Sequence, residues 1–149
     1  MRTRYFALVF GIAFLAAGIL GFIPQLLTPP IGAPPLRVNS FYGVLLGLFP
    51  VNVLHNLVHI LLGLWGLAAW RSFPAARNYA RGVAVIYAVL AVFGLIPGLA
   101  TLFGLVPLFG HDIWLHAVSA AIAAYFGWAP MPAASPATTV PPGDTTYRR

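Results

Sequence analysis

Long apolar runs alternate along the chain with short segments rich in proline, glycine or arginine. The four apolar runs cover residues 5–27, 51–70, 82–103 and 111–128. A helix needs about 20 apolar residues to cross the hydrocarbon core of a bilayer, within a range of about 17 to 25. The first three runs meet this length easily, whereas the fourth is short and is interrupted by a histidine. We therefore predict an all-α fold, an up-down bundle of four transmembrane helices.

The composition supports this interpretation. Hydrophobic residues make up 60% of the 149 residues and charged residues only 7%, whereas soluble domains carry about 25% charged residues. The net charge of +6 comes from scattered arginines, which form no stripe with interleaved aromatics and so predict no nucleic-acid partner. The expected partner is the lipid bilayer. The absence of cysteine excludes disulfides, thiolate metal sites and cysteine nucleophiles.

The arginines predict the orientation. Cytoplasmic loops of membrane proteins carry an excess of basic residues. Arginines lie before the first run, between the second and third runs and at the end of the chain, and the two remaining loops hold only Arg37 between them. We therefore expect a bacterial inner-membrane protein with both termini in the cytoplasm. The first run is too long for the core of a cleaved signal peptide, so we expect it to be retained.

The segments outside the apolar runs are also informative. Residues 28–35 contain four prolines and cannot be helical. Residues 40–49 are apolar again, and we predict a short helix on the outer surface, capped by Ser40 and ended before Pro50. Residues 1–129 then form the transmembrane domain, and the Pro/Ala/Thr-rich residues 130–149 form a disordered cytoplasmic tail.

A faint internal echo indicates two repeated helical hairpins. The sequence Gly-Phe-Ile-Pro at 21–24 resembles Gly-Leu-Ile-Pro at 94–97, and the Gly-Leu-Phe-Pro at 47–50 resembles Gly-Leu-Val-Pro at 104–107. In the second pair, a histidine follows each proline by nine residues, at His59 and His116. Two hairpins inserted the same way would be related by an axis along the membrane normal. The alternative is that Gly-Leu-x-Pro recurs by chance in a chain rich in these residues.

Polar residues gather on one face of each of two predicted helices. The second run carries Asn52, His55, Asn56 and His59 with helical spacing, and the fourth carries Asp112 and His116. At about 1.5 Å per residue, His59 lies roughly 12 Å below Val51, and His116 lies at most about 8 Å below His111. Both polar faces therefore belong to the outer half of the bundle, where we expect them to meet.

Three interpretations of this cluster stay open. It could be a structural hydrogen-bond network between helices. It could be a ligand site, with haem held by His59 and His116, or with a divalent metal held by His55, His59, His116 and Asp112. It could also be a path for protons or a small solute. The chain offers no serine–histidine–acid set, phosphate loop or paired carboxylates, so the sequence favours a protein that is not an enzyme. A homo-oligomer or other membrane subunits remain open as partners.

Glycines in the first two runs favour close packing. Gly11, Gly18 and Gly21 lie in the first run, and Gly63 and Gly66 lie in the second. Small residues let transmembrane helices approach closely. We therefore expect these two helices to lie in direct backbone contact.

Two stretches resemble a group of bacterial four-helix membrane proteins classified only as a domain of unknown function. They are Leu-Phe-Pro-Val-Asn-Val-Leu-His-Asn-Leu-Val-His-Ile-Leu-Leu-Gly-Leu-Trp-Gly at 48–66, and Gly-Leu-Val-Pro-Leu-Phe-Gly-His-Asp-Ile-Trp-Leu-His at 104–116 with Tyr-Phe-Gly at 125–127. The resemblance covers roughly residues 5–128 and implies four membrane helices. It implies no reaction, cofactor or catalytic residue.

Overall fold

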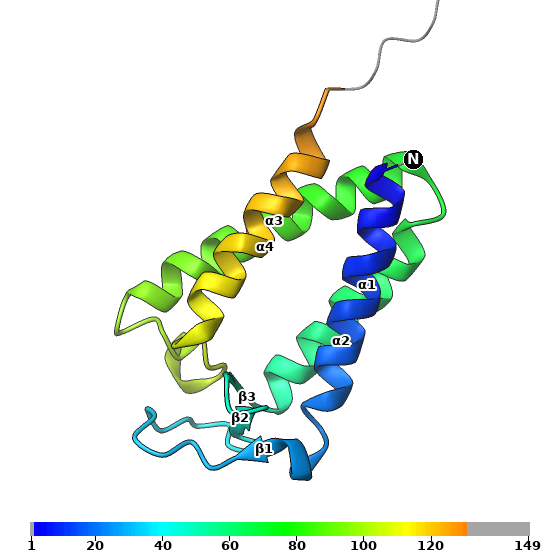
Figure 1. Ribbon diagram of the computed structural model, residues 1–149. Coiled ribbons are helices and arrows are strands. Elements are labelled where there is room, and N and C mark those ends of the chain that lie inside the picture. Colours follow the sequence, from blue (N-terminus) through cyan, green and yellow to red (C-terminus); the bar gives the residue numbers. More distant parts are fainter. Residues whose placement is uncertain (1, 131–149) are drawn as a thin grey trace, which may run out of the picture.

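The computed structural model describes residues 2–130 and shows four α-helices with a small antiparallel sheet at one end (Figure 1). The helices are α1 (Arg2–Leu20), α2 (Val53–Ala69), α3 (Phe73–Leu95) and α4 (His111–Trp128), the strands are β1 (Leu27–Thr28), β2 (Gly43–Leu45) and β3 (Phe49–Val51), and two 3₁₀ turns are η1 (Pro24–Leu26) and η2 (Leu102–Gly104). The predicted all-α four-helix fold is confirmed. The predicted tail lies outside the described residues, apart from its first residue.

The helices pair into two hairpins, α1 with α2 and α3 with α4 (Figure 1). In the first hairpin the backbones nearly touch, as the glycines predicted. A Cβ placed on Gly63 would lie 2.6 Å from the backbone nitrogen of Leu15, and one on Gly11 would lie 2.9 Å from that of Leu67. Gly127 serves the second hairpin, because a Cβ there would lie 3.1 Å from the backbone nitrogen of Arg81 and 2.9 Å from its Cγ. Backbone contact at glycine therefore sets the spacing within each hairpin.

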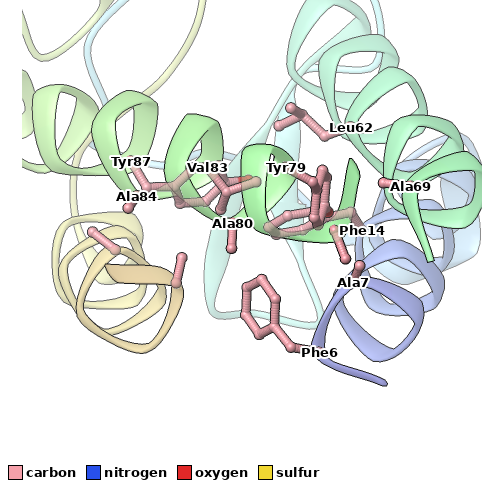
Figure 2. Close-up of a cluster of buried hydrophobic side chains, with 13 residues drawn as sticks. Phe6, Ala7, Phe14, Leu62, Ala69, Tyr79, Ala80, Val83, Ala84 and Tyr87 are labelled. Atoms are coloured by element: carbon pink, nitrogen blue, oxygen red, sulfur yellow. The ribbon is translucent and has the colours of Figure 1, made fainter. Parts of the chain in front are cut away.

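Aromatic side chains fill the space between the two hairpins (Figure 2). The Phe14 ring of α1 stacks on the Tyr87 ring of α3 with 5.1 Å between centroids. Nearer the other end, Phe6 stacks on Phe126 at 4.9 Å and contacts Tyr79 at 6.2 Å. These buried rings are the main apolar connection between the hairpins, and each aromatic pair adds to the gain from burial alone.

The packing agrees with two related hairpins. When the motif at 21–24 is aligned with that at 94–97, Phe14 is the sequence equivalent of Tyr87. In the structure these two rings contact each other across the core. Aligning the other motif pair places His59 opposite His116. The Phe14 ring meets the His59 ring edge-on at 5.6 Å, and the Tyr87 ring meets the His116 ring edge-on at 4.9 Å. Equivalent residues therefore make equivalent contacts.

The predicted interfacial helix at residues 40–49 is wrong. This segment forms β2, a turn and the start of β3, and β2 also pairs with β1. The chain reverses where Leu46 and Gly47 adopt φ values of 53° and 72°, which no α-helix tolerates. Pro50 lies in the edge strand β3, where a missing N–H costs least. The pairing partner of β2 is the end of the first apolar run, which local sequence could not reveal.

Helix ends also depart from the apolar runs. Gly21 and Pro24 follow the last residue of α1, so the end of the first run becomes η1 and β1 instead of helix. The third helix begins early, at Phe73, because the Ser72 hydroxyl caps it by accepting a hydrogen bond from the Ala75 N–H. Arg77 and Arg81 therefore lie within α3 and not in a loop.

The glycine contact yields a first prediction. Substitution of Gly63 by alanine places its Cβ against the α1 backbone, which cannot move aside without separating the helices. We expect the free energy of unfolding to fall by about 1–3 kcal/mol, the usual cost of overpacking. Thermal unfolding of the purified protein in detergent measures the change. Gly98→Ala is the matched control, because nothing lies within 4 Å of a Cβ at that position. Equal melting temperatures for both variants would contradict the close contact.

Candidate functional site

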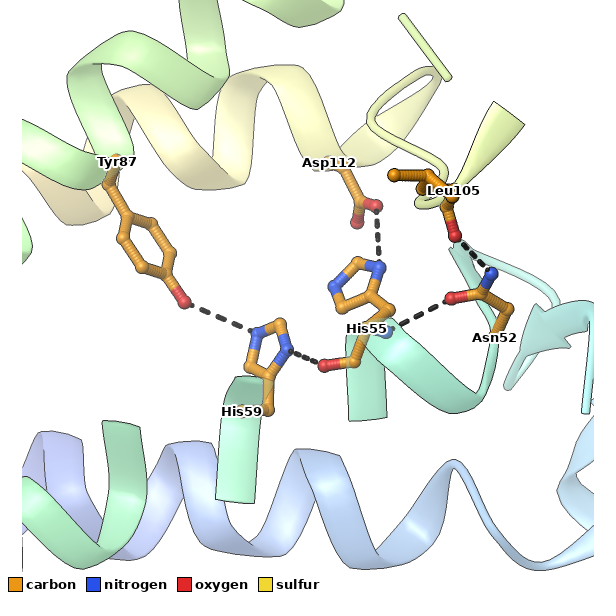
Figure 3. Close-up of polar contacts among 6 residues, drawn as sticks. All are labelled: Asn52, His55, His59, Tyr87, Leu105 and Asp112. Atoms are coloured by element: carbon orange, nitrogen blue, oxygen red, sulfur yellow. Dashed lines mark hydrogen bonds and ion pairs between the residues drawn. The ribbon is translucent and has the colours of Figure 1, made fainter. Parts of the chain in front are cut away.

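The head of α2 is held by Asn52, which is fully buried. Its Oδ1 accepts a hydrogen bond from the His55 N–H at 3.0 Å and so caps α2. Its Nδ2 donates to the carbonyl of Val38 at 2.8 Å and to that of Leu105 at 2.7 Å. The side chain therefore joins both interhelical segments at this end to the start of α2, and Figure 3 shows its bonds to Leu105 and His55. All of these hydrogen bonds are internal, so Asn52 has a structural role.

Asn56 has a comparable role one turn further along α2. Its Nδ2 donates to the Gly21 carbonyl at 2.7 Å, which satisfies a carbonyl just beyond the end of α1. A side chain at position 21 would occupy the space of the Asn56 amide. Glycine at 21 and asparagine at 56 are therefore matched, and together they fix the sheet-covered end of the first hairpin.

His59 is held in one tautomer by its two neighbours (Figure 3). Its Nδ1 lies 3.0 Å from the His55 carbonyl oxygen, which can only accept, so Nδ1 carries the proton. Its Nε2 is then an acceptor and lies 3.3 Å from the hydroxyl of Tyr87, which donates. This bond connects α2 to α3. Both ring nitrogens of His59 are therefore already engaged.

His55 and Asp112 face each other from α2 and α4. Nδ1 of His55 lies 3.8 Å from Oδ2 of Asp112, too far for a hydrogen bond, and both side chains are buried. Asp112 lies in the first turn of α4, where the helix dipole favours a carboxylate. Neither atom has a hydrogen-bond partner within the described residues, and nor does Nδ1 of His116. Buried polar atoms usually have partners, so three unpaired atoms in one cluster are unusual.

A cavity of about 120 Å³ adjoins this pair. Its polar lining consists of His55, Asn56, His59 and Asp112. Its apolar wall comes from α1, α4 and the strands β2 and β3, through Ala17, Leu115, Leu45, Phe49 and Val51. The sheet therefore covers the site from the end of the bundle. By volume the cavity has room for a few water molecules.

The dimensions distinguish between possible ligands. Pockets for drug-sized ligands have volumes of about 300–1,000 Å³, so the cavity is too small for haem. Tyr87 also contacts both His59 and His116, the two predicted axial ligands. For metals, residues 2–130 contain no group of three or more potential ligands close enough to hold an ion. A water-sized polar species fits the space better than either.

A continuous proton path is also not formed by the side chains alone. The imidazole rings of His55 and His59 stack at 4.6 Å between centroids without a hydrogen bond between them. The His59 proton points to a backbone carbonyl, and the His55–Asp112 separation exceeds hydrogen-bond range. Transfer along this set would need a bridging molecule in the cavity.

Four of the six predicted residues thus form the cluster proper: His55, His59, Asp112 and His116. His111 stays outside it, exposed, where its Nδ1 accepts a hydrogen bond from the indole of Trp114 at 2.9 Å. Sequence reasoning missed Tyr87, which is 2% exposed and bonds to His59. Two features of the sequence could have indicated Tyr87. It is a phenol within the third apolar run, and the internal echo aligns it with Phe14.

Fold and cluster define a four-helix protein with a buried polar site between two hairpins at the sheet-covered end. The chain belongs to the family of the domain of unknown function DUF4383, whose model matches residues 4–129. This confirms the resemblance to a family of unknown function. No curated protein and no solved structure matches the chain. Among the helices of residues 2–130, α1 and α3 are long and apolar enough to cross a membrane.

The Asn52 hydrogen bonds yield a second prediction. Asn52→Ala removes the α2 cap and leaves two partly buried carbonyls without donors. We expect the free energy of unfolding to fall by about 2–4 kcal/mol, from about 1 kcal/mol per cap or hydrogen bond and the cost of unpaired carbonyls. Ser72→Ala removes an exposed cap from α3 and is the control, with an expected loss of about 1 kcal/mol. Thermal unfolding compares them, and equal losses would contradict the joining role of Asn52.

Proposed function

We propose that this protein is a multi-pass integral membrane protein in which all four helices cross the bilayer. The distribution of side chains supports the proposal. Large apolar side chains point outward on every helix, including Val9 at 60% exposed, Leu61 at 65%, Leu95 at 69% and Ile122 at 40%. The buried set instead includes asparagine, histidine and aspartate. Soluble proteins rarely expose so large an apolar surface, which lipid would cover here.

The proposed orientation places both termini and the α2–α3 turn in the cytoplasm of a bacterial inner membrane. Arg2, Arg4, Arg71, Arg77 and Arg81 all belong to that end, whereas the sheet-covered end carries Arg37 alone among residues 2–130. Basic residues favour the cytoplasmic side. The polar cluster then lies in the outer half of the membrane.

Thiol labelling tests this orientation and is the third prediction. The chain has no native cysteine, so single cysteines can be introduced at Ile31, which is 92% exposed in the outer segment, and at Ser72 in the α2–α3 turn. We expect a membrane-impermeant maleimide to label Ile31→Cys in intact spheroplasts and to label Ser72→Cys only after lysis. The reverse pattern would overturn the orientation, and labelling of both in intact cells would overturn the membrane placement.

We further propose that the polar cluster binds one small polar ligand, a water molecule or a hydrogen-bond donor of similar size such as ammonium. One observation carries this proposal. His55 Nδ1 and Asp112 Oδ2 face each other beside a small cavity, and neither atom has a hydrogen-bond partner among the described residues. An unsatisfied buried carboxyl group weakens the fold, at a cost of about 1–3 kcal/mol. A ligand that donates a hydrogen bond to this oxygen would remove that cost. The asparagines and the His59–Tyr87 pair would then build the frame around it.

Removal of the carboxylate is the fourth prediction. We expect Asp112→Leu to melt at or above the temperature of the wild type in the absence of ligand, because an unpaired polar group is replaced by apolar volume. We also expect ammonium ions to stabilise the wild type, by about 1.4 kcal/mol at ten times the dissociation constant, and to leave Asp112→Leu unchanged.

The matched control is His111→Ala, which removes an exposed histidine at the same end but outside the cluster. This variant should respond to ammonium as the wild type does. A large loss of stability in Asp112→Leu, with no response of the wild type to ammonium, would contradict the binding proposal and assign the cluster a structural role.

A further inference from the structure

Two arginines contact the C-terminal end of α4, which is the end far from the polar cluster. Arg77 and Arg81 lie one helical turn apart on α3, and each donates through Nε to the carbonyl of Gly127, at 3.0 Å and 2.9 Å. Arg77 also donates through Nη2 to the carbonyl of Ala129 at 3.4 Å. Gly127 makes this possible, because any side chain there would collide with Arg81. Both guanidinium groups are therefore held in place beside one carbonyl oxygen.

This arrangement leaves two positive charges close together without an anionic partner among residues 2–130. The one carboxylate side chain in that part of the chain is Asp112, which lies about 22 Å away along α4 at a rise of about 1.5 Å per residue. Backbone carbonyls at a helix end offset part of the charge but carry no net charge themselves. Two adjacent guanidinium groups repel each other unless an anion lies near them.

The hydrogen bonds also leave donors free. A guanidinium group has five N–H donors in a planar fork. Within residues 2–130, the two Nη groups of Arg81 make no hydrogen bond, and Nη1 of Arg77 makes none either. Both guanidinium groups are fixed through their Nε atoms and keep Nη donors free. Arginine often binds phosphate through two parallel N–H···O hydrogen bonds, which these free donors could form.

The surroundings place this pair at the level of a membrane surface. The Arg81 guanidinium lies over the Trp128 ring at 5.6 Å, and tryptophan is enriched at the interface with lipid headgroups. On the other hairpin, Arg4 lies over Trp70 at 5.7 Å and donates to its carbonyl. The stacked rings of Phe6 and Phe126 join the two hairpins near these arginines.

We propose that Arg77 and Arg81 form a binding site for a phosphate group, carried by the headgroup of an anionic phospholipid or by free phosphate. The site is separate from the outer polar cluster. Its lipid form rests on the proposed membrane placement, because basic residues at the cytoplasmic surface attract anionic lipids. Binding would offset the repulsion between the two arginines and hold α3 against the end of α4.

The test compares Arg77→Gln/Arg81→Gln with the wild type, both as full chains in detergent. Glutamine removes the charge but keeps an N–H donor for the Gly127 carbonyl. The matched control is Arg71→Gln, an exposed arginine of the neighbouring turn. Native mass spectrometry measures retention of phosphatidylglycerol against phosphatidylcholine. A second arm measures the thermal shift produced by sodium phosphate against sodium chloride at equal ionic strength.

We expect the double variant to bind phosphatidylglycerol or phosphate at least about tenfold more weakly, since each surface arginine contributes about 1 kcal/mol. Arg71→Gln should stay within about twofold of the wild type. Preference for phosphatidylglycerol identifies a lipid site, and a shift with inorganic phosphate alone identifies a free-ion site. Retention equal to the wild type in the double variant, equal losses in Arg71→Gln, or no response of the wild type to either probe overturns the proposal.

If the double variant does not fold, as judged by circular dichroism and gel filtration, the two single variants decide, each with an expected loss of about fivefold. The phosphate arm needs no bilayer, and thiol labelling measures the orientation independently. Failure of the phosphate site can therefore be told apart from failure of the membrane placement.

Discussion

The amide of Asn52 holds together three parts of the chain that are distant in sequence. It starts α2, and it binds the carbonyls of Val38 in the first interhelical segment and Leu105 in the second. The cluster depends on this junction. The cap sets the direction in which α2 presents His55, and the bond to Leu105 anchors the segment that leads to Asp112. In an apolar molecule with few polar groups, one satisfied amide has a large influence on the arrangement of the rest.

The site can be understood as a departure from symmetry. The internal echo aligns His59 with His116 and His55 with Asp112, and these residues meet where the two hairpins face each other. Two identical hairpins would place like groups opposite each other. Here a carboxylate faces an imidazole, and Tyr87 supplies a hydroxyl that its counterpart Phe14 lacks. Because the two hairpins differ at these positions, the polar centre places a carboxylate beside an imidazole and a hydroxyl donor beside an imidazole nitrogen.

The two ends of the bundle differ in charge. The sheet-covered end holds the sole carboxylate of the described residues, whereas the opposite end holds five arginines. Arginines at that end also satisfy carbonyls at the ends of α2 and α4, which would otherwise lack donors. One residue type therefore contributes both to helix termination and to the charge asymmetry from which we infer the orientation.

The sequence by itself determined the four helices, the glycine contact and the matching polar faces of α2 and α4, because these follow from local composition and helical spacing. It did not determine the sheet, since β2 pairs with β1 across the intervening residues 29–42, and only the folded chain brings the two strands into register. Nor did it separate the roles of the polar residues. Spacing alone cannot show that Asn52 is fully hydrogen-bonded while Oδ2 of Asp112 is not, because the carbonyls that Asn52 binds lie on distant segments and no donor of the described residues reaches that oxygen. Only the tertiary structure decided which of these buried polar atoms lack a hydrogen-bond partner among the described residues.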